Sequence, residues 1–385
     1  MARRRTRGWL QWPIQRGDAT GTVRRIDRRT VMPPPLALLP RRAALALAAL
    51  VLAAAAIAAT AAGAELPTRL SATGAPMPGQ PLPAGVATFT PQYPLWSDGS
   101  DKRRWIRLPA GTAIDASDPD AWVFPPGTRL WKEFSVDGRR VETRLIERMD
   151  DGSWRYAAYL WDADGRDATL APARGATLAV PGAPKGRYTV PSRGDCVACH
   201  GSARAAVVGF AALQLSPERD PLITRGAARP GDVDLRSVAE RGWLRGLPAA
   251  LLADAPRVAA ASPVERAALG HLHGNCAHCH NTGDDRAPVR LTLALSVADP
   301  AGSRDAVLRT LVDAASRWRP SGSSADARVV VAGRPDDSTL FVRMRSRDPR
   351  AQMPPLGSVV PDPEGLALVQ RWIEHHLAPT KELQP

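Results

Sequence analysis

The sequence predicts an α+β multidomain chain in which a sandwich-like antiparallel β module is followed by a mainly α-helical region. At 385 residues the chain is too long for one ordinary hydrophobic core. Residues 132–145 alternate between apolar and polar side chains around an Asp-Gly pair, the pattern of a β-hairpin. Farther on, Ser262 and Asp362 each precede a proline, which is a helix-start signal. Strand signals therefore precede helix signals along the chain.

An arginine-rich segment followed by an uncharged run opens the chain. Residues 1–64 hold eleven arginines and two aspartates, a net charge of +9 out of +13, which leaves +4 for residues 65–385. The uncharged run at 43–64 follows Arg41-Arg42 and ends in the small-x-small triplet Ala62-Gly63-Ala64. This order is typical of a signal peptide. We therefore expect an exported, periplasmic protein, and the basic excess does not indicate nucleic-acid binding.

The leader leaves two alternatives open. A start at Met32 would give a signal peptide of ordinary length, so residues 1–31 are either a spurious extension or a genuine basic one. The run at 43–64 is also long enough to cross a bilayer as an uncleaved anchor, and no other stretch approaches that length. Contact with a membrane is expected only if the leader is retained.

A β domain is expected at residues 87–190, after a Pro- and Gly-rich linker at 65–86. The hairpin turns at Asp137-Gly138, and a second turn at Asp151-Gly152 leads into another strand. One face of that strand is predicted to carry Trp154, Tyr156 and Ala158. The domain contains no His or Ser partner for its scattered acids, so no catalytic residue is assigned.

Six of the eleven tryptophans lie in the expected β domain at residues 87–190: Trp96, Trp105, Trp122, Trp131, Trp154 and Trp161. We expect them to fill the core of the β domain and its cross-strand pairs. The alternative is an aromatic surface that binds a carbohydrate or a partner protein.

Every cysteine of the chain lies in one of two Cys-x-x-Cys-His motifs, Cys196-Val-Ala-Cys199-His200 and Cys276-Ala-His-Cys279-His280. Covalent attachment of a c-type haem needs two thiols on one local turn to bond the vinyl groups and a following imidazole to bind the iron. Both motifs supply these groups. The sequence therefore predicts two covalently bound haem c groups, with His200 and His280 as iron ligands.

The cysteines allow two other interpretations. A zinc site built from two Cys-x-x-Cys pairs is disfavoured because 76 residues separate Cys199 from Cys276, whereas zinc ribbons space their pairs by roughly 15–20 residues. A disulfide framework would be sparse in a chain of this length and would explain neither histidine.

The first haem region is expected at 191–261, with its motif following a Pro- and Gly-rich loop. A second haem domain is expected at 262–385. There Ser262-Pro-Val-Glu265 has the form of a capping box, and its helix is predicted to run through Leu269 and Leu272 into the second motif. Further helices are expected at 306–312, at 338–345 and from Asp362, the last with Leu366, Val369, Trp372 and Ile373 facing the core.

At these residues the C-terminal third resembles a class I c-type cytochrome. The resemblance implies a haem that follows an N-terminal helix, a methionine sixth ligand some distance on, and a C-terminal helix packed across the first. Met353, in Gln352-Met-Pro-Pro-Leu-Gly357, lies 73 residues after His280. Its two following prolines keep the loop out of a helix, so Met353 is the predicted sixth ligand of the second haem.

The chain from about residue 88 onward also resembles an uncharacterised family of secreted bacterial dihaem c-type cytochromes. The resemblance rests on Tyr93-Pro-Leu-Trp-Ser-Asp-Gly99, Leu130-Trp-Lys-Glu-Phe134 and His273-Gly-Asn-Cys276. It implies export and two haems but brings no substrate.

The sixth ligand of the first haem is left open by the sequence, because no methionine lies between His200 and the second motif. His273, at the end of the predicted helix, is the tentative candidate, and Met149 is another. Met77 and Met344 remain as distant possibilities, and a vacant position would allow a small ligand to bind.

We expect a dihaem cytochrome that carries out electron transfer between redox partners, such as a dehydrogenase or quinol oxidase and a terminal acceptor. Methionine ligation favours relay over chemistry, so an electron carrier is favoured over an enzyme. One alternative is a peroxidase-like dihaem enzyme whose first haem iron has a vacant coordination position. The other is a β domain that binds a carbohydrate or a partner protein and is connected to the haems. Partner identity, haem potentials and oligomeric state are not expressed in the sequence.

Overall fold

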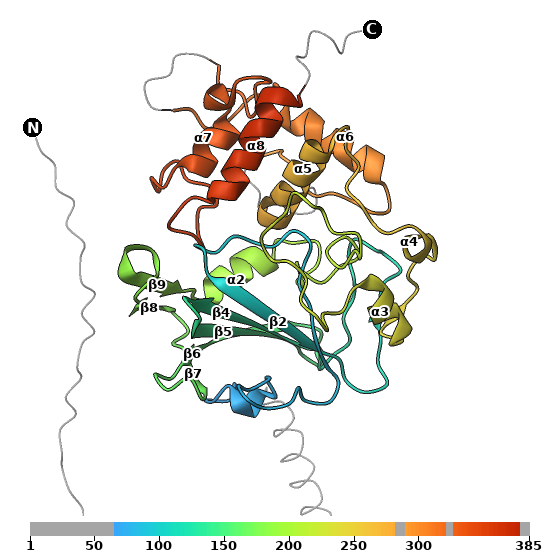
Figure 1. Cartoon of the computed structure of the whole chain (residues 1–385), viewed down its shortest axis with the longest axis vertical. Helices are drawn as coiled ribbons and strands as arrows, with labels where there is room; N and C mark the ends of the chain where they lie inside the picture. The colour runs from blue at the N-terminus through green and yellow to red at the C-terminus, as the bar shows by residue number, and fades with distance from the viewer. Residues whose placement is uncertain (1–64, 282–288, 321–325, 378–385) are drawn as a thin grey trace, which may run out of the picture. The chain divides into compact units, whose positions relative to one another are not determined.

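The computed structural model describes residues 65–281, 289–320 and 326–377 (Figure 1). The predicted signal peptide and the alternative anchor at 43–64 lie outside these residues. Across the three described ranges, no helix is long and apolar enough to cross a membrane. The described chain from Leu66 onward belongs to one compact unit.

A six-stranded antiparallel sheet dominates the first half of this unit. In spatial order its strands are Val86–Thr88 (β1), Asp101–Arg107 (β2), Arg129–Val136 (β4), Arg139–Arg148 (β5), Trp154–Trp161 (β6) and Ala168–Leu170 (β7). Two smaller sheets pair Ala176–Ala179 (β8) with Arg187–Val190 (β9), and Ile114–Asp115 (β3) with Leu244–Arg245 (β10).

The two predicted turns are confirmed. Asp137 and Gly138 join β4 to β5 with φ angles of 48° and 76°, as a two-residue hairpin turn requires. Gly152 has a φ angle of 81° in the turn before β6, and the side chain of Asp151 accepts a hydrogen bond from the Ser153 amide at 2.8 Å. These turns fix the register that places Trp154, Tyr156 and Ala158 on one face.

The α+β class is confirmed, but the sandwich-like arrangement is not: among the described residues only the short β8–β9 hairpin packs on the main sheet as a second strand layer, and helices and loops cover the rest. One face buries Trp105 and Trp131 against Leu70, in the segment expected as a linker. The other face contributes Ile106 and Leu130 to a cluster that continues into the helices. Alternation shows that strand residues are buried but does not specify what covers them.

Three of the six tryptophans are core residues, as expected. Trp105, Trp122 and Trp131 are buried, and the Trp131 indole donates a hydrogen bond to Thr73 at 3.0 Å. Trp154 and Trp161 are half-buried on β6. Trp96 lies outside the sheet and contributes to the site described below.

The helical region contains the expected helices. Its elements are Arg193–His200 (α2), Leu235–Glu240 (α3), Ala250–Ala253 (α4), Pro263–Cys276 (α5), Pro300–Leu311 (α6), Thr339–Arg345 (α7) and Pro363–His375 (α8). In Figure 1, α5 to α8 gather at one end, the sheet lies at the other, and α2 lies beside the sheet.

Both predicted N-caps are confirmed. The Ser262 side chain accepts a hydrogen bond from the Glu265 amide at 3.1 Å, and the Asp362 side chain accepts one from the Gly365 amide at 3.0 Å. The reciprocal bond of a capping box is shifted by one residue, since Glu265 accepts from the Ala261 amide instead. The caps set where α5 and α8 begin, and these two helices pack against each other.

Candidate haem-binding site

The second motif is presented by the end of α5. Cys276 is the last residue of the helix, and the amides of Cys279 and His280 both donate to the Cys276 carbonyl, at 3.1 and 2.9 Å. The chain therefore continues in tight turns past the helix end. This local geometry holds both thiols and the imidazole on consecutive turns, as haem attachment requires.

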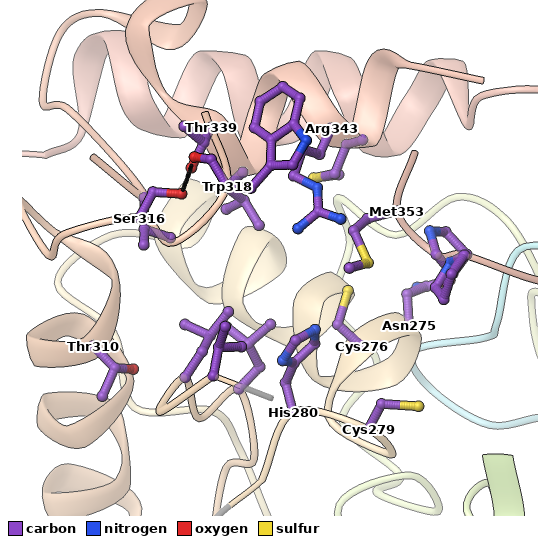
Figure 2. A pocket seen from close by; sticks show the side chains of 18 of the residues that line it. Asn275, Cys276, Cys279, His280, Thr310, Ser316, Trp318, Thr339, Arg343 and Met353 are labelled. Carbon is purple, nitrogen blue, oxygen red and sulfur yellow. Dashed lines mark hydrogen bonds between the residues drawn. The ribbon is translucent and has the colours of Figure 1, made fainter. Parts of the chain in front are cut away.

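A cavity of about 720 Å³ adjoins this motif, within the range of roughly 300–1,000 Å³ for small-molecule and cofactor sites. Cys276, Cys279 and His280 line it on one side and Met353 on another (Figure 2). The structure thus brings the predicted sixth ligand and the predicted proximal histidine to one cavity.

The lining of this cavity fits a haem. Its apolar wall residues include Leu291, Leu293, Trp318, Val329, Leu340 and Leu366. His280 Nδ1 is buried and has no hydrogen-bond partner among the described residues. Burial lowers the pKa of His280, which favours the neutral imidazole that binds metals. Thiols, imidazole, thioether and apolar walls are the donor set and surroundings of a c-type haem.

The loop that carries Met353 is fixed by α7. The Met353 amide donates to the Arg343 carbonyl at 3.0 Å, and the Arg343 guanidinium donates back to the Ala351 carbonyl at 2.8 Å. Arg343 also lies over the Trp318 ring, 5.4 Å from its centroid. These contacts hold the thioether side chain at the cavity (Figure 2).

A segment before β2 forms another part of the cavity wall. The Trp96 amide donates to the Asn275 side chain at 2.7 Å, and the Trp96 indole donates to the Val360 carbonyl at 3.0 Å. Asp98 accepts from the amides of Val359 and Val360 at 2.8 and 3.0 Å. Residues 93–99 therefore connect α5 to the chain that follows Met353.

Two glycines of α5 allow this segment to approach. A Cβ atom on Gly270 would lie 2.1 Å from the Tyr93 ring, and one on Gly274 would lie 2.3 Å from the Tyr93 carbonyl oxygen. Such distances exclude any larger residue without displacement of the backbone. The roles of Trp96, Asn275 and Arg343 were not predicted from the sequence, in which residues 93–99 carried only a family resemblance.

The first motif lies within a helix. Ser192 caps α2, and its side chain accepts from the Asp195 amide at 3.1 Å while Asp195 accepts from the Ser192 amide at 2.9 Å. This box starts the helix only four residues before Cys196, so both thiols and His200 fall on α2. The expected Pro- and Gly-rich loop is not observed: only Pro191 and Ser192 lie between β9 and α2, and the Pro- and Gly-rich residues before them belong to the β8–β9 hairpin.

His200 is oriented by two contacts. Its Nδ1 lies 2.6 Å from the Ala206 carbonyl oxygen, and its ring packs on Tyr156 with centroids 5.4 Å apart. A donor bond from Nδ1 leaves Nε2 to bind a metal, the usual arrangement of a ligating histidine. Burial lowers the pKa of His200 to about 4, so the ring is neutral at neutral pH.

The two motifs touch each other. The Cys199 and Cys279 thiols interact, and this interaction raises the pKa of Cys199 and lowers the pKa of Cys279. Ser202 Oγ lies 4.0 Å from Cys279 Sγ, and the Asn281 side chain donates to the Ser202 carbonyl at 3.0 Å. The two Cys-x-x-Cys-His motifs, which are far apart in the sequence, therefore meet at the sulfur atoms of Cys199 and Cys279.

The alternatives for the cysteines gain no support. All four cysteines are described, and all four are free thiols. Within the described ranges, no three His, Cys, Asp or Glu side chains are grouped so that they could hold a metal ion. A four-cysteine zinc site would need such a group.

The candidate sixth ligands of the first haem lie in different surroundings. His273 Nδ1 accepts a hydrogen bond from the Leu295 amide at 3.0 Å, and the ring also bonds to the backbone of Leu293. Met77 packs in the cluster on the sheet face opposite to His200. Met149 lies in the turn between β5 and β6, and Met344 lines the cavity of the second motif.

Comparison with protein families matches residues 312–357 to the family described as Planctomycete cytochrome C. The matched residues include Met353 and most of its supporting contacts, and they follow both motifs. The C-terminal region is cytochrome c-like. This likeness implies covalently bound haem c and haem-based electron transfer. Comparison with curated proteins and with solved structures gave no match.

Proposed function

We propose that the protein is a dihaem c-type cytochrome of the periplasm that relays electrons between redox partners. Cys196 and Cys199 would attach one haem, with His200 on its iron. Cys276 and Cys279 would attach the other, with His280 and Met353 as its axial ligands. When bound, each haem supplies a one-electron couple whose potential depends on its ligands and surroundings.

The contact between the two motifs, at Cys199, Ser202 and Cys279, carries this proposal. Each sulfur would bond directly to a haem edge, so no layer of protein separates the two attachment points. Two redox groups attached at touching residues are suited to exchange electrons. A pair of independent carriers would not need this contact.

The cavity of the second motif supports electron transfer rather than catalysis as the function. His280 and Met353 would occupy both axial positions and leave none for a substrate. Sulfur ligation and the apolar walls both favour the reduced iron, which raises its potential. The second haem would therefore be the electron acceptor within the pair.

For the first iron, His273 is the tentative sixth ligand. It lies on α5, three residues before Cys276, so one helix would serve both haems. Ligation would require its ring to leave a backbone partner, Leu295 or Leu293. Replacement of His273 by Ala should then convert this iron from low-spin to high-spin.

The proposed partners are a dehydrogenase or quinol oxidase on the donor side and a terminal acceptor on the other. No nucleic acid is proposed, and a membrane is involved only if the leader is uncleaved. Export is part of the proposal because thioether bonds form where the attachment machinery works.

A visible spectrum with a reductive titration of the exported protein tests the proposal. We expect two haems per chain, both low-spin, and electron exchange between them faster than their reduction by an external donor. The same chain expressed without residues 1–64 should be colourless. A high-spin first iron that reacts with peroxide would replace the relay by a peroxidase-like enzyme, and zinc in place of haem would overturn both.

A further inference from the structure

Three cations lie directly opposite one another across the main sheet. Arg104 on β2 pairs with Lys132 on β4, and Lys132 pairs with Arg144 on β5. Lys102, two residues before Arg104, projects from the same face. We call these four residues the cation row. Like charges at opposed positions of a sheet repel each other, so the arrangement is destabilising unless an anion balances it.

The protein balances only part of this charge. Glu142 binds Arg144 through two hydrogen bonds of 2.8 and 2.9 Å and also accepts from the Tyr188 hydroxyl at 2.7 Å. Within the described part of the chain, neither Lys102 nor Lys132 has a hydrogen-bond or ion-pair partner. The Lys132 ammonium lies 4.8 Å from the centroid of the Phe134 ring.

The surroundings of Lys102 and Lys132 disfavour the charged form of both side chains. Burial, with help from neighbouring arginines, lowers the pKa of Lys102 to about 7 and the pKa of Lys132 well below its usual value. Keeping a half-buried ammonium charged is costly, and the nearest carboxylates, Asp101 for Lys102 and Glu142 for Lys132, offset only part of that cost. A bound anion would remove much of this cost for both side chains.

The cation row faces the first motif. Helix α2 packs on β6, and His200 contacts Tyr156 on that strand. Across the sheet, the row Arg104, Lys132 and Arg144 continues to Ala158, two residues from Tyr156 on the same face. The positive charge of Lys132 contributes to the lowered pKa of His200, and Arg144 and Cys196 interact electrostatically. The residues that would hold the first haem are therefore the neighbours of the row.

We propose that the cation row binds the two propionate carboxylates of the haem attached at the first motif. This inference rests on the proposed function, since it assumes a haem at Cys196 and Cys199. Haem carries two carboxylates, which is the ligand chemistry that two unpaired ammonium groups and a buried guanidinium select. A dissolved anion such as phosphate offers related chemistry, and the experiment below separates the two.

Replacement of Lys132 by Met tests the inference, with redox titration of each haem as the readout. Loss of the cation leaves a propionate uncompensated, which favours ferric iron, so the midpoint potential of the first haem should fall. The potential of the Met353 haem should be unchanged. Lys132→Arg keeps the positive charge and should leave the midpoint potential of the first haem at its wild-type value. Lys102→Met should lower this potential, as Lys132→Met does.

Lys185→Met is the matched control, because Lys185 is an exposed lysine between β8 and β9. An equal shift in Lys132→Met and Lys185→Met, or no shift in either, would overturn the inference. A wild-type potential that changes with phosphate at constant ionic strength, and saturates, would assign the row to a dissolved anion instead. Absence of haem at Cys196 and Cys199 in the wild type would be a failure of the proposed function itself.

Discussion

Met353 and His280 line one cavity although they lie 73 positions apart in the sequence. If both bind one iron, Met353→Ala should abolish the sulfur-to-iron charge-transfer band of the ferric protein. The potential of that haem should also fall, because the thioether favours ferrous iron. Visible absorption and redox titration measure the two effects.

Met344→Ala is the control for this change. Met344 also lines the cavity, but it lies on α7 and is not the predicted sixth ligand of the second haem. Its replacement should leave the band in place. Survival of the band in Met353→Ala would show that the second haem takes its sixth ligand elsewhere.

Each cysteine pair should attach one haem independently of the other. The double change Cys196→Ala and Cys199→Ala should halve the ratio of haem to protein and leave the methionine-ligated spectrum intact. The pair Cys276→Ala and Cys279→Ala should also halve the ratio but remove that spectrum. An unchanged ratio in either double variant would contradict attachment at the altered motif.

Gly274→Ala should destabilise the fold by about 1–3 kcal/mol, the usual cost of overpacking. The new methyl group would lie 2.3 Å from the carbonyl oxygen of Tyr93, which backbone cannot easily avoid. Chemical denaturation of the haem-loaded protein measures the change. Gly194→Ala is the control, since its Cβ would lie 3.5 Å from Ser192 Oγ. Equal stability of the two variants would show that residues 93–99 do not press on α5.

Asp362 should make the stability of the fold depend on pH. Burial opposes its charge, but hydrogen bonds from Arg225 at 2.8 and 2.5 Å outweigh this and lower the pKa of Asp362. A carboxylate with a lowered pKa stabilises the fold above its unfolded value, near 3.9, and this contribution is lost as pH falls through the folded value. Asn can still cap the helix, so Asp362→Asn removes mainly the charge-assisted bonds to Arg225, and wild type should be more stable than this variant by roughly 2 kcal/mol at pH 6.

The difference between wild type and Asp362→Asn should shrink below about pH 4. Glu364→Gln, on the same first turn but more exposed, should cost less than roughly 1 kcal/mol at any pH. Urea denaturation at several pH values gives both curves. A difference that is constant with pH would mean that ionisation of Asp362 does not contribute to the stability of the fold.

Local features of the fold could be predicted from the sequence because their causes are local. Asp137-Gly138 sets a hairpin turn by its backbone preferences, and Ser262 and Asp362 cap their helices within four residues. The Cys-x-x-Cys-His motifs and Met353 were recognisable for the same reason, since each is a short pattern with its own chemistry.

The relations between distant segments could not be predicted in this way. Nothing local to Cys199 or Cys279 indicates that they meet, and the cover of the sheet depends on packing across the whole unit. Trp96 was grouped with the strand tryptophans, although Pro94 and the absence of alternation around it set it apart. That difference was the available signal for its place at the cavity.

The hydrogen bonds of Trp96 and Asp98 to Val359 and Val360 bear on how this protein can be divided. A fragment that begins at residue 262 would keep His280 and Met353, the proposed ligands of the second haem, but would lose Leu95 and Trp96 from the cavity wall. Water would then reach the iron from that side. The cytochrome c-like region is therefore not structurally independent. Any fusion of this region to another electron carrier would have to include residues 93–99.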